Sequence, residues 1–262
     1  MSDPAGIADS IPRTALVTGA AHRIGRAIAL DLAARGFAVA LHYNSSRAEA
    51  EALAGKIRDR GGKAVTLGAD LSRETDSAAL IGRAAEALGP VGCLVNNASR
   101  FEMDLWDTVT RESWDAHMET NLRAPFVLAQ AMAAALPAQA QGAIVNLLDQ
   151  RVWNLTPFFI SYTLAKAGLW TLTQTLALAL APRIRGNAIG PGPTLKSQRQ
   201  SENQFREQWE AVPLTHGSTP EEIAAGVRFI LAAPAMTGQM IALDGGQHMG
   251  WAQPPRGNTP KE

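Results

Sequence analysis

Tyr162 and Lys166 stand four residues apart in the segment LLDQRVWNLTPFFISYTLAKAG (147–168). On the helix that this segment predicts, the spacing puts both side chains on one face. A tyrosine is a poor acid–base group at neutral pH because its usual pKa is about 10. A neighbouring ammonium group stabilises the phenolate and is expected to lower the pKa of Tyr162. The pair therefore predicts a proton-transfer site.

A second chemical signal is the stretch TGAAHRIG (18–25), which follows an apolar run and opens a helical pattern. Backbone N–H groups and the helix dipole at such a turn form an anion site. Gly19 and Gly25 match a nucleotide-binding turn, but Arg23 stands where a middle glycine would let the backbone approach a pyrophosphate. The turn predicts a dinucleotide site altered at one position.

The end of the second expected strand, HYNSSR (42–47), decides between cofactors. An acidic residue there would bind the ribose 2′-hydroxyl of NAD, and the chain has Asn44 instead. Ser45 and Ser46 offer hydrogen-bond donors to a 2′-phosphate, so the stretch favours NADP(H). Ser46 is equally suited to cap the next helix.

Polar side chains also follow the next two strands, Asp70 in GADLS and Asn97 in the run Asn96-Asn97-Ala98. Each could be a turn former. Ligands of open α/β sheets bind at the carboxyl ends of the strands, so together these residues extend the predicted cofactor site.

These residues must be positioned by alternating strands and helices. Short apolar runs predict strands at 14–19, 37–43, 63–71, 91–99, 142–149 and 239–246. Helical periodicity is expected at 26–36, 46–62, 73–88, 111–136, 161–181 and 219–232. Such alternation predicts an α/β fold, a doubly wound parallel sheet with helices on both faces. We expect one domain over residues 1–262, with a core at 12–250 and a tail at 251–262 that is loose or packed on a partner.

Composition limits the function classes. The 24 Lys and Arg residues balance 24 Asp and Glu residues, so charge predicts neither a nucleic-acid nor a membrane partner. No apolar run approaches ~20 residues and no signal peptide is evident, which predicts a cytoplasmic protein. Cys93 is the single cysteine, so no disulfide within the chain is expected. His22, His42 and His117 have no convincing metal-ligand spacing, so no metal is predicted.

Over residues 12–250 the chain resembles the short-chain dehydrogenase/reductase family. The landmarks of the resemblance are Thr18-Gly19…Gly25, Asp70, Asn96-Asn97-Ala98, Asn121, Tyr162-x-x-x-Lys166, Pro191-Gly192 and Asp244-Gly245-Gly246. The resemblance implies a Rossmann-type fold with a seven-stranded sheet, and a homotetramer. It implies that Tyr162 donates the proton, Lys166 binds the nicotinamide ribose and Asn121 holds a water.

Together, the residues and the resemblance assign a cofactor-binding set. Its members are Gly19, Arg23, Ile24, Gly25, His42, Asn44, Ser45, Ser46, Asp70, Leu71, Asn97, Ala98, Tyr162, Lys166, Pro191 and Gly192.

Two positions depart from the usual family pattern, and both departures resemble its pteridine reductase and dihydromonapterin reductase branch. Asp149 stands thirteen residues before Tyr162, where most members carry a serine. Arg23 replaces the middle glycine, and TGAAHRIG is similar to the TGAAKRLG of that branch. The NNASRF stretch places Ser99 and Phe101 where that branch stacks a pterin.

The expected substrate chemistry is consistent with a small, pterin-like molecule. An aromatic face such as Phe101 stacks on a flat heterocycle, and a planar guanidinium at Arg23 could pair with pyrophosphate and pterin together. Asp149 could act as a second acid, because reduction of a C=N bond needs a proton on nitrogen. Trp209 lies in a segment (195–212) that closes over substrate in this family.

Plainer interpretations of these four residues stay open. Asp149 could simply cap a loop, Phe101 could be core packing, and Arg23 could serve the cofactor alone. The amphipathic pattern around Trp209 equally fits a packing helix.

The sequence thus predicts an NADPH-dependent oxidoreductase that reduces a dihydropterin-like C=N bond, with Tyr162, Lys166, Asp149 and Asn121 as catalytic residues. One alternative is a reductase of 3-oxoacyl or small keto substrates, against which Asp149 argues. Another is a regulator that senses NADP(H) without turnover, which would not need a proton relay.

Overall fold

A parallel sheet runs through the computed structural model, which describes residues 6–197 and 199–250. Within those residues the sheet has seven strands in the order β3-β2-β1-β4-β5-β6-β7. The strands are β1 (Thr14–Val17), β2 (Ala38–Tyr43), β3 (Ala64–Gly68), β4 (Val91–Asn96), β5 (Gly142–Leu147), β6 (Ile184–Pro191) and β7 (Met240–Leu243). The predicted Rossmann-type architecture is confirmed. The tail at 251–262 lies outside the described residues.

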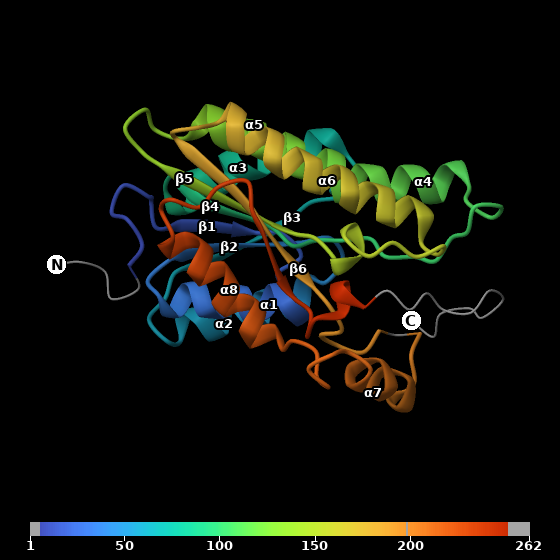
Figure 1. Cartoon of the computed structure of the whole chain (residues 1–262). Coiled ribbons are helices and arrows are strands. Elements are labelled where there is room, and N and C mark those ends of the chain that lie inside the picture. The colour runs from blue at the N-terminus through green and yellow to red at the C-terminus, as the bar shows by residue number, and fades with distance from the viewer. Residues whose placement is uncertain (1–5, 198, 251–262) are drawn as a thin grey trace.

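Helices cover both faces of this sheet, with α1, α2 and α8 on one side and α3 to α6 on the other (Figure 1). The helices are α1 (Arg23–Ala34), α2 (Arg47–Arg58), α3 (Glu74–Leu88), α4 (Arg111–Met118), α5 (Ala124–Ala135), α6 (Ile160–Ala179), α7 (Glu202–Glu210) and α8 (Pro220–Ala232). Two apolar cores form between sheet and helices, one containing Ile28 and Val227 and the other Leu80 and Leu128. Burial on both faces is why the strands read as apolar runs.

The hydropathy pattern does not predict β6, whose sequence IRGNAIGP is interrupted by polar residues and glycine. Tertiary contacts satisfy those polar groups. The Arg185 guanidinium donates to the carbonyls of Ile230 and Met236 at 3.0 and 2.9 Å, and Asn187 Nδ2 donates to the Met236 carbonyl at 2.9 Å. Because these partners are distant from β6 in sequence, local sequence patterns do not predict this strand.

Two predicted helices differ from the structure near the site. The expected helix at 111–136 is divided by a π-helical turn, η1 (Glu119–Arg123), which contains Asn121. The helix expected at 26–36 begins earlier, at Arg23. π-helical turns inside α-helices are frequent at functional sites.

The strand order reverses between β1 and β4, and this reversal places the functional loops. Ligands of doubly wound sheets bind in the crevice outside the carboxyl ends of the strands at such a point. The segments that follow β1, β4, β5 and β6 all leave the sheet at this edge. The site is therefore expected here.

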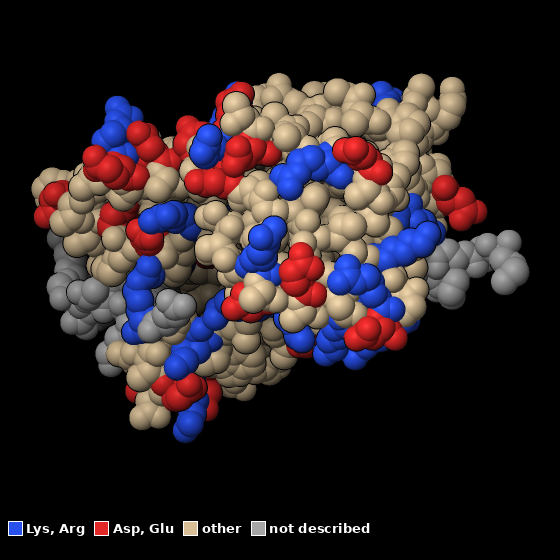
Figure 2. Space-filling view, turned by 180° about the vertical axis from the view of Figure 1, so that it is seen from behind, with Lys and Arg blue, Asp and Glu red and all other residues tan. Residues whose placement is uncertain are grey.

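The surface shows no single-sign charge patch on the face in Figure 2, where acidic and basic side chains are interspersed. No helix within the described ranges is long and apolar enough to cross a membrane.

Candidate active site

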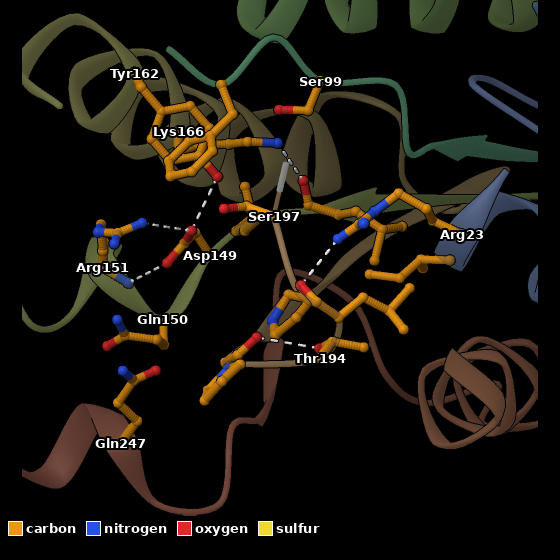
Figure 3. A pocket seen from close by; sticks show the side chains of 18 of the residues that line it. Arg23, Ser99, Asp149, Gln150, Arg151, Tyr162, Lys166, Thr194, Ser197 and Gln247 are labelled. Atoms are coloured by element: carbon orange, nitrogen blue, oxygen red, sulfur yellow. Dashed lines mark hydrogen bonds and ion pairs between the residues drawn. The ribbon is translucent and has the colours of Figure 1, made fainter. Parts of the chain in front are cut away.

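The first turns of α6 carry Tyr162 and Lys166 into the crevice, as their spacing predicts (Figure 3). Both side chains are buried, with 5% and 2% of their surface exposed. Tyr162 Oη donates to Asp149 Oδ2 at 2.9 Å, and Lys166 Nζ donates to the Leu147 carbonyl at 2.7 Å. Residues at the end of β5 therefore meet the start of α6 through these two hydrogen bonds.

Asp149 has a second partner, Arg151, which the sequence reading missed. Asp149 Oδ1 accepts from the Arg151 backbone N–H at 2.9 Å, and the Arg151 guanidinium lies 3.3 Å from Oδ2. This places Asp149 at the N-cap of a short 3₁₀ turn, η2 (Gln150–Val152). Asp149 thus caps the loop and also contacts Tyr162, so the two interpretations of this residue are compatible. Only the position of Arg151, two residues after Asp149, hinted at its role.

In the protein alone, the pKa of Tyr162 is not lowered as its spacing to Lys166 predicts. The pKa of Tyr162 is raised well above its usual value, mainly by burial and then by the Asp149 carboxylate. Burial also lowers the pKa of Lys166 to about 8. The prediction of a lowered tyrosine pKa is therefore wrong for the protein alone, because burial and the Asp149 carboxylate both disfavour the phenolate.

Asn121 uses its side-chain amide to hold the backbone of Arg100. Its Oδ1 accepts from the Arg100 N–H at 2.8 Å, and its Nδ2 donates to the Arg100 carbonyl at 2.8 Å. The residue therefore fastens the segment after β4 beside the site. Its expected role in holding a water stays a prediction.

The glycine turn is built for close backbone contact. Gly19 adopts a φ of 62°, which favours glycine, and a Cβ on Gly25 would lie 2.3 Å from the Gly19 carbonyl oxygen. Asn97 Nδ2 clamps the turn by donating to the carbonyls of Thr18 and Gly19 at 2.8 and 3.1 Å. This turn leads directly into the N-terminus of α1. The cradle fits a dinucleotide phosphate group.

His42 supports this turn from inside the protein. Its Nδ1 accepts from the Gly19 N–H at 3.1 Å, so Nε2 carries the proton that is shared with the Ala69 carbonyl at 3.1 Å. The side chain is 1% exposed, and burial lowers its pKa. The sequence predicts that His42 binds the cofactor, whereas in the structure both of its ring nitrogens contact backbone groups of the protein.

Arg23 adopts a φ of 52°, a left-handed conformation that is uncommon outside glycine. Its guanidinium donates to the carbonyls of Leu195 and Lys196 at 2.9 and 2.8 Å. These bonds connect the glycine turn to the segment after β6 and help to offset the backbone strain. Arg23 and Ile24 both line the pocket described below.

The remaining cofactor candidates lie along the edge of the sheet. Asn44 and Ser45 are exposed after β2, and Ser46 occupies the N-cap of α2 without a side-chain capping bond. Asp70 accepts from Ser72 Oγ at 2.7 Å, which lowers the pKa of this carboxyl group.

Further candidates are divided between the apolar core and the pocket. Leu71 packs in the apolar core that contains Leu80. Pro191 and Gly192 line the pocket, and a Cβ on Gly192 would lie 2.7 Å from Asp244 Cα.

A pocket of about 270 Å³ joins the glycine turn to the catalytic group. Asp149, Tyr162 and Lys166 line it together with Ser99 and Phe101. The sequence reading missed several lining residues, which are Gln150, Arg151, Thr194, Ser197, Gln200, Phe205, Gln208 and Gln247. Apart from Arg151 and Phe205 they are neutral amides and hydroxyls, and all of them lie in loops, short 3₁₀ turns or α7, where no spacing pattern marks them.

Phe101 belongs to an aromatic group beside Tyr162. Its ring stacks on Phe159 at 4.5 Å and meets the Tyr162 ring edge-on at 4.7 Å. The Arg151 guanidinium lies 5.4 Å from the same ring. Phe101 therefore packs against neighbouring rings and also borders the pocket. Both interpretations of this residue, core packing and contact with a flat substrate, are compatible with its position.

Trp209 is not among the residues that line this pocket. It lies on α7 beside Phe205, with ring centroids 5.5 Å apart, and near Gly217. Its substrate role stays a prediction. No group of metal-ligating side chains occurs among the described residues.

Comparisons with known proteins agree on one family. A family model described as enoyl-(acyl carrier protein) reductase matches residues 19–248. The 3-oxoacyl-(acyl-carrier-protein) reductase of Staphylococcus epidermidis is 33% identical over 242 residues, covering 90% of this chain and 99% of that protein.

Two solved structures are more similar in sequence. FolM alternative dihydrofolate reductase 1 from Brucella canis, complexed with NADP, has a TM-score of 0.91 and 47% identity, over 95% of this chain and 100% of that one. The same protein from Brucella suis, also with NADP, has a TM-score of 0.89 and 49% identity, over 92% and 97%.

Proposed function

Because the chain belongs to the short-chain dehydrogenase/reductase family, we propose that it is an NADPH-dependent reductase of a C=N bond in a dihydropterin-like substrate. The observation that carries this proposal is the hydrogen bond from Tyr162 Oη to Asp149 Oδ2 at 2.9 Å. It puts a carboxyl group, and not a serine hydroxyl, next to the proton donor.

The similarity pattern supports the pterin substrate. The dihydrofolate reductases named FolM are 47% and 49% identical to this chain, whereas the 3-oxoacyl reductase is 33% identical. Phe101 offers an aromatic edge to the same pocket, which suits a flat heterocycle.

NADP(H) is the cofactor of this site. Gly19, Gly25 and the N-terminus of α1 would hold its phosphates, and the exposed Asn44 and Ser45 would meet the 2′-phosphate. When bound, it supplies the hydride for the reduction. Lys166 lies on the face of α6 that carries Tyr162 and would contact the nicotinamide ribose.

The protons are handled by the chain's own residues. Tyr162 and Asp149 share one hydrogen bond at the pocket wall, so a proton on either group can move towards a substrate nitrogen. Arg151 stays paired with Asp149 and stabilises its charged form once the proton has left. Arg23 would pair with the pyrophosphate and the pterin.

Reduction of a 3-oxoacyl thioester is the second candidate, since the 33% identical relative aligns over 99% of its length. In that case Tyr162 would protonate a carbonyl oxygen. An ionised Asp149 beside the oxygen would repel the developing negative charge, which disfavours this reaction.

The two candidates are separated by following NADPH oxidation with dihydrobiopterin, dihydromonapterin and dihydrofolate, and in parallel with 3-oxoacyl thioesters and simple ketones. NADH replaces NADPH in a second series. We expect turnover with a dihydropterin and NADPH, and none with a Tyr162→Phe variant that still binds NADPH. Turnover with the carbonyl compounds alone would contradict the pterin assignment while leaving the family intact.

A further inference from the structure

A buried polar cluster formed by Asp104, His117 and Ser161 lies next to the site but takes no part in the proposed proton transfer. The three residues are 3%, 0% and 0% exposed. Ser161 Oγ lies 2.7 Å from His117 Nδ1 and donates to Asp104 Oδ2. The Glu102 backbone N–H donates to His117 Nε2 at 3.1 Å.

The residue types match a Ser-His-Asp triad, but the direction of the hydrogen bonds excludes nucleophilic catalysis. Because His117 Nε2 accepts from an amide, the ring proton is on Nδ1 and is donated to Ser161 Oγ. The hydroxyl proton of Ser161 is donated to Asp104, so the histidine cannot act as its base. The cluster is a closed network with a single arrangement of protons.

The network connects three elements that surround Tyr162. We call residues 97–110, which include Phe101, Glu102 and Asp104, the Phe101 loop. Asp104 receives the Ser161 N–H at 3.2 Å, and the Asp104 carbonyl receives the Phe159 N–H at 2.9 Å, which ties the loop to the start of α6. His117 ties the same loop to α4.

We propose that His117 is a positioning residue that holds the Phe101 loop against α6 and thereby sets the affinity for substrate. Phe101 lies 4.7 Å from the Tyr162 ring, and the Glu102 N–H held by His117 is the next backbone group along the chain. Loss of this hydrogen bond would loosen the loop at Glu102, next to Phe101, while the bonds of Asn121 and Asp104 still hold its other parts. Asn97 and Ala98, at the start of the Phe101 loop, are held to the glycine turn through Thr18 and not through His117, so we expect cofactor binding to stay the same.

The same contact makes the loop sensitive to acid. Protonation of His117 Nε2 would replace its acceptor by a donor and would repel the Glu102 N–H. Burial lowers the pKa of His117, and the positive charge of Arg100 lowers it further. The negative charges of Asp104 and Glu102 act in the opposite direction but are outweighed. The Tyr162 ring, 6.1 Å away, also faces the imidazole. The neutral ring is thus the form present at pH 7, and the loop would loosen only in acid, below the usual titration range of histidine.

Two substitutions of His117 separate its contacts. His117→Gln places an amide where Nε2 lies, so it can accept from the Glu102 N–H but cannot titrate. His117→Asn places an amide near Nδ1, so it can reach Ser161 but not Glu102. We would measure KM and kcat between pH 5.5 and 8, the Kd for NADPH, and hydrogen exchange of the Glu102 amide in the full chain.

We expect His117→Asn to raise KM roughly three- to tenfold, with kcat nearly unchanged, because one hydrogen bond is lost. Its Glu102 amide would exchange faster, and the Kd for NADPH would stay the same. In His117→Gln, KM would stay near the wild-type value at pH 7.5 and would lose the rise that the wild type shows in acid. A wild-type KM and Glu102 exchange in His117→Asn, or an unchanged acid rise in His117→Gln, would overturn the proposal.

If both variants fail to fold, Ser161→Ala removes the bridging hydroxyl and is expected to change KM and Glu102 exchange in the same direction. Unchanged values in Ser161→Ala would equally overturn the proposal. This proposal about His117 depends on the proposed function in one respect, the choice of substrate for the KM assay. The exchange measurement needs no substrate, and KM can be followed with a 3-oxoacyl thioester if no dihydropterin is reduced, so the two failures are distinguishable.

Discussion

Asp149 serves two partners with its two carboxylate oxygens. One oxygen accepts from the Arg151 backbone, and the other accepts from Tyr162 while facing the Arg151 guanidinium. A serine at this position could replace the hydrogen bond to Tyr162 but could not supply a second acid or pair with a buried guanidinium. This residue therefore distinguishes reduction of a C=N bond from reduction of a carbonyl in our proposal.

Asp149→Ser is expected to lower kcat/KM for a dihydropterin by about 100-fold or more, because a positioned acid–base group is removed. A simple ketone, if it is reduced at all, should lose much less, since Tyr162 and Lys166 remain. Steady-state assays with both substrates check this. Equal losses for the two substrates would show that Asp149 only supports the loop and Arg151.

Lys166 carries a stability cost that depends on pH. Burial lowers its pKa from the usual 10.5 to about 8, so the folded chain disfavours the ammonium form. The unfolded chain therefore binds this proton more tightly than the folded chain. The resulting loss of folding stability has its full size below pH 8 and disappears as the pH rises towards 10.5.

Lys166→Met is expected to raise the free energy of unfolding at pH 7 by about 1–3 kcal/mol, after allowance for the lost bond to the Leu147 carbonyl. Denaturant unfolding of the cofactor-free chain at pH 7 and pH 10 measures the effect. The gain should shrink at the higher pH, and a gain that grows with pH would contradict the burial argument. The variant should also lose reductase activity.

At the scale of elements, the turn between β1 and α1 depends on how closely backbone segments approach one another. A Cβ on Gly25 would lie 2.3 Å from the Gly19 carbonyl and 2.5 Å from Asn97 Nδ2. By contrast, a Cβ on Gly55 in α2 would meet no described atom within 4 Å outside the adjacent backbone of its own helix.

Gly25→Ala is therefore expected to destabilise the protein by about 2–3 kcal/mol and to weaken NADPH binding at least tenfold, because the turn must shift. Gly55→Ala is the matched control and should stabilise the chain by about 0.5–1 kcal/mol. Thermal unfolding and NADPH titration measure both effects. Normal cofactor affinity in Gly25→Ala would refute a role for close packing in this turn.

At the scale of the whole molecule, several large apolar side chains remain exposed. Phe229 on α8 is 59% exposed and, with Leu214 and Met249 at 61% and 66%, borders an open groove of about 600 Å³. Exposed apolar patches of this kind mark interaction surfaces. We propose that a second copy of the chain covers this face, in line with the expected homotetramer.

Phe229→Glu is then expected to reduce the size of the assembly, because a carboxylate would be buried at the interface. Ala87→Glu, on the exposed side of α3, is the control for added charge and should leave the assembly unchanged. Sedimentation velocity of the wild type and the two variants measures the size of each assembly. A wild-type chain that sediments as a monomer would contradict the proposed assembly.

Most of the architecture was predictable because it depends on local patterns. Apolar runs predicted six of the strands in the sheet, and the spacing of Tyr162 and Lys166 correctly put both on one helix face. The apolar pattern did not predict β6, because the polar side chains of this strand bond the carbonyls of Ile230 and Met236, which are distant in sequence.

The sequence by itself determined six of the seven strands of the described sheet, the position of the glycine turn and the types of residue that can transfer protons, since these follow from periodicity and spacing. Only the tertiary structure decided which groups face each other. It paired Asp149 with both Tyr162 and Arg151, put His42 beneath the turn, and closed the network of His117. Burial and pairing between distant segments also set the direction of the Tyr162 pKa, which neighbouring residues alone predicted wrongly.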